Sequence, residues 1–309
     1  MLNGVDALAK KDVWAVGYSQ RPGGRYETLV EHWNGDHWRV VKSPNAGTNP
    51  YNTLTSVDAV SSSDAWAVGS YRTATSRKTL IERWNGNSWS VVKSPNPASF
   101  GNSLLGVAAT GPNDVWAVGW KISDRGLQSL ILHYDGKVWT ETAAPTVGTG
   151  GNVLTDISAV SANDIWAAGY YDDGTEQKTL TLHYNGTSWS SVPSASGGDG
   201  VSILMDISAS SPSDAWAVGF EYRDSLKHYV STAQHWNGST WDAVRNAISS
   251  KYVYEGAMYS VAKVPGSSQV WAIGYPQDAE VICPSASTAQ VNLQSSIFGS
   301  KVSTVPSTW

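Results

Sequence analysis

The hydrophobic and polar positions of this chain follow one pattern that recurs along its whole length. In the unit covering 52–95, an apolar stretch at 54–60 precedes a cluster of turn residues, and a second apolar stretch follows at 65–71. A polar segment then leads to 79–84, where apolar and polar residues alternate, and to a final stretch at 88–95. Alternation with a period of two and turn residues between the stretches predict four short β-strands joined as an antiparallel meander.

Two short motifs mark each unit. The expected second strand carries Trp-Ala-x-Gly, with its tryptophan at Trp14, Trp66, Trp116, Trp166, Trp216 and Trp271. Successive copies lie 52, 50, 50, 50 and 55 residues apart, and we expect the motif's glycine where a neighbouring strand comes close. Between the third and fourth strands, Asn85-Gly86 and its equivalents predict a two-residue type I′ hairpin, which needs two left-handed residues. A period of this length with four strands per unit is typical of a β-propeller.

The repeats therefore predict one all-β domain spanning 1–309, a six-bladed β-propeller of four-stranded antiparallel blades. We expect the blades at approximately 1–45, 52–95, 102–145, 152–193, 202–245 and 256–309. The sixth blade is degenerate, because no Asn-Gly-x-x-Trp hairpin follows Trp271 and its fourth strand must come from the segment ending at Trp309. Its outer edge is the weakest part of the predicted ring, since an uncovered strand edge favours association.

Charge and composition exclude several function classes. The 21 basic and 26 acidic residues give a net charge of −5 without a basic run, so nucleic acid is not an expected partner. The single cysteine, Cys283, can form neither an internal disulfide nor a thiolate metal site, and we expect no metal or cofactor. No segment is long enough to span a membrane.

Low charge with abundant Ser, Thr, Asn, Gly and Trp favours a secreted or extracellular bacterial protein, which we expect to be a monomer. The chain opens almost directly in a repeat, which suggests that a leader or a preceding domain is missing.

The Trp-Ala-Val-Gly strand followed by a Gly-x-x-Trp hairpin resembles the repeats of the BNR and Asp-box propellers, including the photosystem assembly-factor type. The resemblance to kelch repeats is looser. The resemblance to the BNR and Asp-box repeats covers five units well and the sixth in part. Where an Asp-box carries its aspartate, this chain has Trp33, Trp84, Tyr134, Tyr184 and Trp236. The resemblance thus implies a bacterial β-propeller, and it does not imply sialidase activity.

The repeat accounts for most residues that suggest chemistry. Fourteen of the sixteen tryptophans occupy repeat positions, where we expect core packing rather than ligand stacking; only Trp120 and Trp309 lie outside them. Four histidines share one position on different units, so they cannot converge on a metal ion: His32, His133, His183 and His235. The aspartates before the motif are expected to hold the first turn by accepting backbone N–H bonds: Asp12, Asp64, Asp114, Asp164 and Asp214.

The crossovers between units and the loops between second and third strands are expected to be long and to share one face. Function usually lies on variable loops of a rigid scaffold, so this face is the predicted binding face. Its candidate ligand-binding residues are Asn52, Asn102, Asn152, Asp6, Asp58, Tyr51, Phe100, Trp120, Arg72, Arg125, Arg223 and Tyr254. The asparagines could instead hold turns, and the aspartates and arginines could simply be solvated.

Three functions are compatible with these residues. The first is a non-enzymatic module that recognises a glycan or a protein. The second is a glycan hydrolase or lyase, in which Asp156 and Asp206 form a carboxylate pair at the channel mouth with separated pKa values. The third is a structural propeller of a larger chain. No triad order, P-loop or dinucleotide motif is present, which favours the first and leaves enzymatic activity open.

Overall fold

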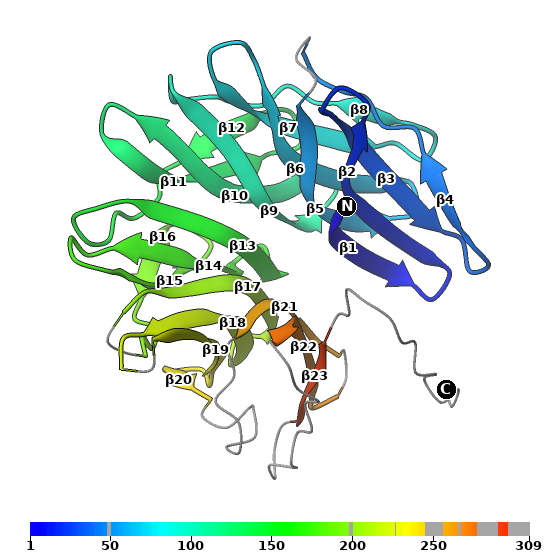
Figure 1. Cartoon of the computed structure of the whole chain (residues 1–309). Helices are drawn as coiled ribbons and strands as arrows, with labels where there is room; N and C mark the ends of the chain where they lie inside the picture. Colours follow the sequence, from blue (N-terminus) through cyan, green and yellow to red (C-terminus); the bar gives the residue numbers. More distant parts are fainter. Residues whose placement is uncertain are drawn as a thin grey trace.

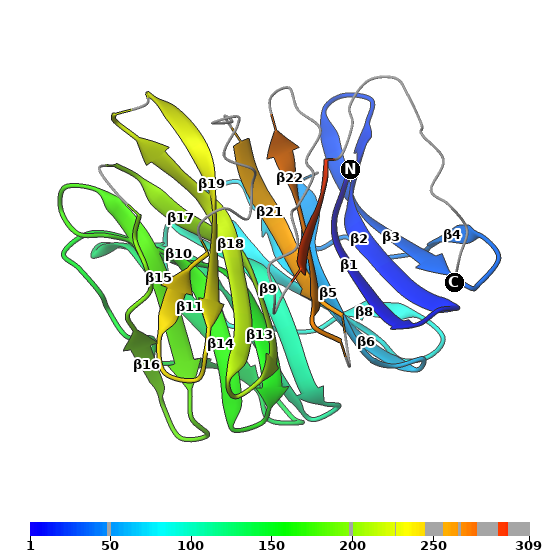
Figure 2. The same ribbon diagram turned by 90° about the horizontal axis from the view of Figure 1, so that it is seen from below.

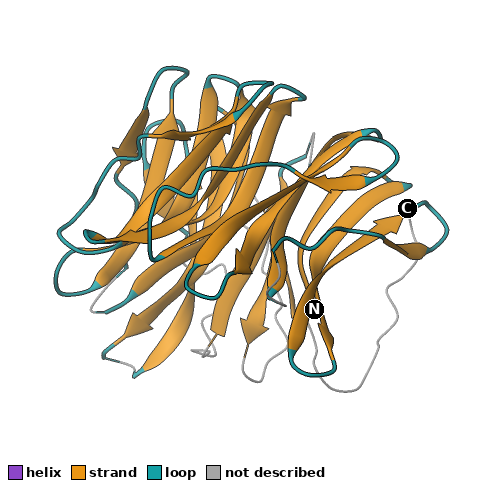
Figure 3. Cartoon of the chain, turned by 90° about the horizontal axis from the view of Figure 1, so that it is seen from above, coloured by secondary structure: helices purple, strands orange, loops and turns teal. Residues whose placement is uncertain are grey.

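A computed structural model of the chain describes residues 1–47, 51–197, 200–225, 227–244, 256–264, 267–276 and 290–295. Every regular element in these ranges is a β-strand, as Figure 3 shows. A bilayer-spanning helix is accordingly not found in the described part of the chain. The prediction of an all-β fold is confirmed.

The strands form successive antiparallel sheets of four, which we call blades, each paired in sequence order. The bounds in blade 1 are β1 (Leu2–Ala9), β2 (Asp12–Arg21), β3 (Arg25–Trp33) and β4 (Trp38–Val41). Those in blade 2 are β5 (Asn52–Ser61), β6 (Asp64–Arg72), β7 (Arg77–Trp84) and β8 (Trp89–Val91). Those in blade 3 are β9 (Gly101–Gly111), β10 (Asp114–Ser123), β11 (Gly126–Tyr134) and β12 (Trp139–Thr142).

The bounds in blade 4 are β13 (Asn152–Ser161), β14 (Asp164–Asp172), β15 (Gln177–Tyr184) and β16 (Trp189–Val192). Those in blade 5 are β17 (Ser202–Ser211), β18 (Asp214–Arg223), β19 (His228–Trp236) and β20 (Trp241–Ala243). A last sheet, blade 6, has three described strands: β21 (Gly256–Lys263), β22 (Gln269–Pro276) and β23 (Gln290–Ser295).

The blades lie side by side in sequence order around an arc (Figures 1 and 2). The first strand of each blade is innermost and contacts the first strand of the next, from β1 through β5, β9, β13 and β17 to β21. A single parallel bridge between Arg77 and Gly101 also joins blades 2 and 3. This propeller-like arrangement places the crossovers between blades on one face.

A β-bulge in each inner strand explains the fixed glycine of the motif. In blade 2 the bulge lies between Leu54 and Ser56, opposite Gly69. A Cβ atom on Gly69 would lie 2.0 Å from the carbonyl oxygen of Thr53, which no side chain tolerates. The same close approach recurs in the other blades, so the predicted role of this glycine is confirmed.

The hairpin between third and fourth strands differs from the predicted type I′ turn. Trp84 and Trp89 are directly paired, so the loop contains four residues instead of two. The Asn85 side chain accepts hydrogen bonds from the N–H groups of Asn87 at 3.0 Å and Ser88 at 2.9 Å. Only Gly86 has a positive φ, of 88°. The asparagine is needed for its side-chain oxygen and not for a left-handed backbone.

The core lies between blades. Trp66 of blade 2 packs against Tyr134 and Trp139 of blade 3, with ring centroids 4.8 and 5.5 Å apart. Equivalent tryptophans of the other complete blade pairs make the same contacts. The motif tryptophans of blades 1 to 4 are thus covered by the hairpin aromatics of the following blade. Each removes roughly 150–250 Å² from water, so the interfaces between blades carry much of the fold's stability.

The first and last blades depart from this packing. Trp271 of blade 6 is 43% exposed, whereas the five preceding motif tryptophans are 0–4% exposed. On the opposite side, Trp38 of blade 1 is 45% exposed, whereas its equivalents in blades 2 to 5 are 5–7% exposed. Within the described residues, no row of contacts like those between neighbouring blades joins β21 to β1. A closed ring is therefore not seen, and these two faces lie on either side of the opening (Figure 1).

Blade 6 also differs in strand direction. Its third described strand, β23, pairs with β22 in parallel, where an antiparallel strand is predicted. The fourth strand predicted for this blade, and with it Trp309, lies outside the described residues.

Candidate functional site

Each aspartate before the motif bonds to the shared histidine position on the third strand. Asp114 Oδ1 lies 2.6 Å from Nε2 of His133, and the imidazole stacks on Trp116 with centroids 4.0 Å apart. Blades 1, 4 and 5 repeat this contact, and blade 2 replaces the histidine with an arginine that bonds to its aspartate through two nitrogens. The predicted role of these carboxylates as acceptors of backbone N–H bonds is not confirmed, because their observed partners are side chains, and the histidine or arginine partner was missed. Its signal was the constant pairing of an acid with a basic position about twenty residues later.

The described residues contain no group of three or more His, Cys, Asp or Glu side chains arranged to hold a metal ion.

The inner-strand aspartates bond to the neighbouring blade. Asp6 Oδ2 accepts the Ala59 N–H at 2.8 Å, and Asp58 Oδ2 accepts the Ala109 N–H at 2.8 Å. Burial, with a smaller contribution from the negative charge of Asp6, raises the pKa of Asp58 to about 7, although the hydrogen bond from the Ala109 N–H opposes the shift. Burial also raises the pKa of Asp6. These carboxyl groups join neighbouring inner strands by hydrogen bonds. This structural role explains their positions, and no ligand is needed to explain them.

Asp156 and Asp206 are brought together as predicted. The Ile207 N–H lies 3.3 Å from Oδ2 of Asp156 and 2.7 Å from Oδ1 of Asp206, and Asp206 Oδ2 also accepts the Val261 N–H at 2.8 Å. Burial, with the charge of Asp206 and a hydrogen bond between the two carboxyls, raises the pKa of Asp156 well above its usual range. Glycosidase carboxyls lie about 5 to 9.5 Å apart, so this pair is too close to hold a sugar carbon or a water between them.

The three asparagines are buried at the start of the inner strands. Asn102 accepts the Ala98 N–H at 3.1 Å and donates to the Ala98 carbonyl at 2.8 Å. Asn152 does the same with Val147, at 2.9 and 2.8 Å, and Asn52 accepts the Ala46 N–H at 2.8 Å. The structure therefore favours the turn-holding interpretation over ligand contact.

The loops between second and third strands are shorter than predicted. In blade 2 the strands run to Arg72 and from Arg77, and these two residues are paired. In blade 3 they extend to Ser123 and from Gly126. The pairing between second and third strands extends into the polar residues that were predicted to form the loop. The crossovers between blades are therefore the long connections on this face.

Aromatic and cationic side chains gather on the crossover face. Arg72 lies over the Tyr51 ring at 5.3 Å from its centroid, and Tyr51 contacts Tyr26 at 5.3 Å. Trp120 is half-buried, with Arg77 at 5.7 Å from its centroid.

Phe100 is exposed on the crossover between blades 2 and 3. Arg223 pairs with the buried Glu221, and its Nε donates to Oε1 at 2.6 Å. Tyr254 lies outside the described residues.

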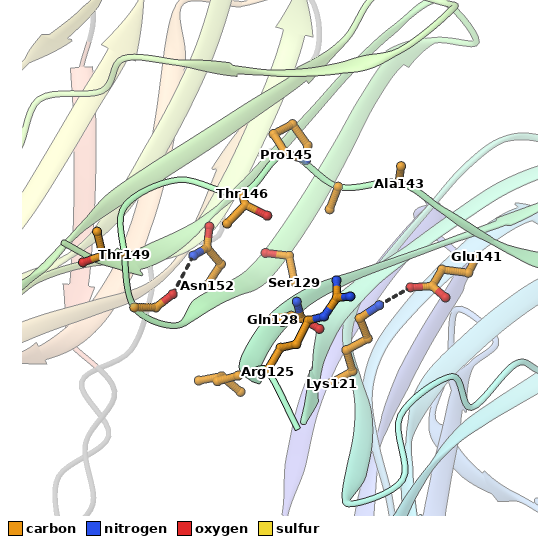
Figure 4. A pocket seen from close by; sticks show the side chains of 13 residues that line it. Lys121, Arg125, Gln128, Ser129, Glu141, Ala143, Pro145, Thr146, Thr149 and Asn152 are labelled. Atoms are coloured by element: carbon orange, nitrogen blue, oxygen red, sulfur yellow. Dashed lines mark hydrogen bonds and ion pairs between the residues drawn. The ribbon is translucent and has the colours of Figure 1, made fainter. Parts of the chain in front are cut away.

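A pocket of about 530 Å³ opens on this face between blades 3 and 4 (Figure 4). Its volume is within the range of small-molecule sites, roughly 300–1,000 Å³. Lys121 of β10 is paired with Glu141 of β12 on one wall, and Arg125 lies at the mouth in the turn between β10 and β11. The other lining residues are Leu127, Gln128, Ser129, Ala143, Ala144, Pro145, Thr146, Thr149, Gly150 and Asn152.

Two predicted residues, Arg125 and Asn152, therefore meet at this pocket, whereas Ser129 and Glu141 were missed. Ser129 is 7% exposed, and its hydroxyl has no hydrogen-bond partner among the described residues. Figure 4 shows it between Arg125 and the crossover residues Thr146 and Asn152. Buried polar groups are normally hydrogen-bonded, so a buried hydroxyl without a partner favours the binding of a ligand that can form this hydrogen bond.

No family model matches the chain. No curated protein matches it in sequence. Among solved structures, a GH74 xyloglucanase from Xanthomonas campestris matches at 13% identity with a TM-score of 0.53, covering 85% of this chain and 42% of the xyloglucanase. YCF48 bound to a peptide matches at 14% identity and TM-score 0.46, covering 84% and 70%. A PL25 ulvan lyase matches at 11% identity and TM-score 0.47, covering 82% and 70%.

At these identities, structural likeness shows the fold alone. The likeness to the xyloglucanase, with a TM-score of 0.53, supports the propeller-like arrangement of the blades. None of the three matches assigns the chain to the BNR or Asp-box repeats.

Proposed function

We propose that this protein is a ligand-recognition propeller that binds a glycan on its crossover face. The observation that carries the proposal is the pocket between blades 3 and 4. It joins a cation at its mouth, an unpaired buried hydroxyl and apolar walls formed by Leu127 and Pro145. Such a mixture of a few placed polar groups on an apolar surface is typical of small-ligand sites.

The surroundings of the pocket favour a saccharide over a folded protein surface. Exposed or half-buried rings stand on the same face at Tyr51, Phe100 and Trp120, and flat rings with amphipathic faces stack on sugar rings. A concave pocket of this size holds one or two sugar units, whereas a protein partner would need a larger apolar area. Recognition of a protein segment is the alternative that the binding experiment addresses.

The carboxylate pair gives less support to an enzyme. Asp156 and Asp206 bond to each other and to backbone N–H groups of the neighbouring inner strands, so both have structural partners. We therefore assign them to inter-blade contacts and keep glycan hydrolysis or lysis as the second candidate. We also propose three properties of the whole protein. These are a six-bladed ring closed by the terminal blades, a secreted location and a monomeric state.

A glycan array with the full chain tests the proposal, followed by calorimetry on any hit. We expect binding with micromolar to millimolar affinity. Sugars that share the same terminal unit should compete with one another for the site. Asp156→Asn should leave this binding unchanged and show the same background turnover as wild type. Absence of glycan binding at millimolar concentrations would reject the proposal, and turnover abolished by Asp156→Asn would restore the enzymatic alternative.

A further inference from the structure

The pocket lies where blade 3 lacks a side-chain network that blades 1, 2 and 4 retain. In blade 2, the hydroxyl of Thr79 bonds to the Ser94 hydroxyl at 2.7 Å and donates to the Pro95 carbonyl at 3.0 Å, while Asn96 accepts the Thr79 N–H at 2.8 Å. These contacts hold the start of the crossover against the third strand.

Blades 1 and 4 make the same contacts with equivalent residues. Thr28 bonds to Ser43 at 2.8 Å, and its N–H donates to Asn45 at 3.0 Å. Thr179 bonds to Ser194 at 2.9 Å, and its N–H donates to a second serine, at position 196, at 3.2 Å. The network is thus shared by blades 1, 2 and 4.

Blade 3 has substitutions at three of these positions. Ser129 stands where blades 1, 2 and 4 have threonine, Ala144 where they have serine, and Thr146 where they have asparagine or serine. Since Ala144 offers no hydroxyl, Ser129 loses the partner that its equivalents have, and its oxygen is left buried without a bond. The three substitutions coincide with the pocket, whose lining contains all three residues.

The charges around this opening point to an acidic ligand. Lys121 is neutralised by Glu141, whereas the Arg125 guanidinium makes no ion pair or side-chain hydrogen bond in the part of the chain that the structure describes. A guanidinium presents paired donors that match a carboxylate, and it binds carboxylates better than it binds neutral hydroxyls. At the base of the pocket, Ser129 can form a hydrogen bond with a hydroxyl group of the same ligand.

Resting on the proposed function, we propose that the pocket between blades 3 and 4 binds a carboxylated sugar, a uronic acid unit. Its carboxylate contacts Arg125 at the mouth, a hydroxyl reaches Ser129 at the base, and the sugar ring lies against Leu127 and Pro145. Blade 3 acquired this site by losing packing that blades 1, 2 and 4 keep.

The repeat itself supplies the test. The double variant Ala144→Ser with Thr146→Asn restores the residues of blade 2 and should rebuild the network to Ser129, so that its hydroxyl is no longer available to a ligand. Calorimetry with oligogalacturonate and oligoglucuronate, against neutral oligosaccharides of equal length, measures binding. We expect wild type to prefer the uronates, Arg125→Gln to weaken uronate binding at least tenfold, and the double variant to abolish it while melting no lower than wild type.

Arg25→Gln is the matched control, because Arg25 is an exposed arginine at the equivalent turn of blade 1, and it should leave uronate binding unchanged. Uronate binding that survives the double variant would overturn the inference by placing the site elsewhere. Binding of neutral glycans only would also overturn it and would leave the proposed function standing. Binding of an acidic peptide in place of every glycan would reject both.

Discussion

Glu82 is the buried acid whose effect on stability is easiest to calculate. It lies on β7 facing blade 1, with no exposed surface; Oε2 accepts the Ser43 hydroxyl at 2.7 Å, and Oε1 has no partner among the described residues. Burial raises its pKa from 4.5 to about 8, although the Ser43 hydrogen bond opposes the shift. The folded protein therefore keeps this carboxyl protonated at neutral pH.

The raised pKa makes stability fall as pH increases. Between pH 4.5 and about 8 the folded state holds one more proton at this residue than the unfolded state does. Each pH unit in this window costs about 1.4 kcal/mol, so the full penalty above pH 8 is roughly 5 kcal/mol at most. Below pH 4.5 both states are protonated and the penalty is absent.

Glu82→Gln should remove this penalty while retaining an acceptor for Ser43. The repeat already uses this solution, because Gln234 fills the same position in blade 5 and accepts the Ala195 N–H at 3.0 Å. We expect the variant to match wild type near pH 4.5 and to exceed it by several kcal/mol at pH 9, as measured by urea unfolding followed by circular dichroism. Each pH should be measured at constant ionic strength.

Glu31→Gln is the control, because Glu31 occupies the same position in blade 1 but is only partly buried. It should change the pH dependence little. If Glu82→Gln and wild type lose stability in parallel between pH 5 and 9, the side chain is ionised or solvated in the folded state and the reasoning fails.

Two further predictions concern packing. Gly69→Ala should destabilise the fold by roughly 3 kcal/mol or more, because its Cβ would overlap the Thr53 carbonyl, whereas Gly111→Ala, with open space around it, should change the unfolding free energy by under about 0.5 kcal/mol. Trp89→Ala should cost about 3–5 kcal/mol and Trp38→Ala less than about 1 kcal/mol, because only Trp89 is buried. Equal costs for the two tryptophans in urea unfolding would show that the face of blade 1 is covered in solution, and a neutral Gly69→Ala would contradict the assigned bulge.

The sequence predicted the blades well because the Trp-Ala-x-Gly motif and the hairpin recur with fixed spacing. It also predicted that Asp156 and Asp206 would meet, since equivalent positions on neighbouring inner strands lie side by side. The predicted hairpin conformation was wrong, because Asn-Gly is compatible with two kinds of turn. Only the number of residues between the paired aromatics distinguishes these turns.

The pocket was not predicted, because it depends on what is missing. Ala144 and Thr146 interrupt a Ser-Pro-Asn sequence present in the first two units, but neither residue suggests chemistry by itself. Only the bonds made by their equivalents show that Ser129 loses a partner. The pairing of β23 could not be foreseen either, since the sixth unit lacks the hairpin that sets strand direction elsewhere.

The order in which aromatic rings cover one another also bears on synthesis. In blades 1 to 4 the motif tryptophan is covered by the hairpin of the following blade, as Trp14 is by Trp84 and Trp89, about seventy residues further along the chain. A blade leaving the ribosome therefore stays incomplete until most of the next one has emerged. Assembly should proceed from the amino end with a delay of one repeat. Trp216 is covered by aliphatic residues of blade 6 instead, and the last motif tryptophan, Trp271, stays 43% exposed in the described part of the chain.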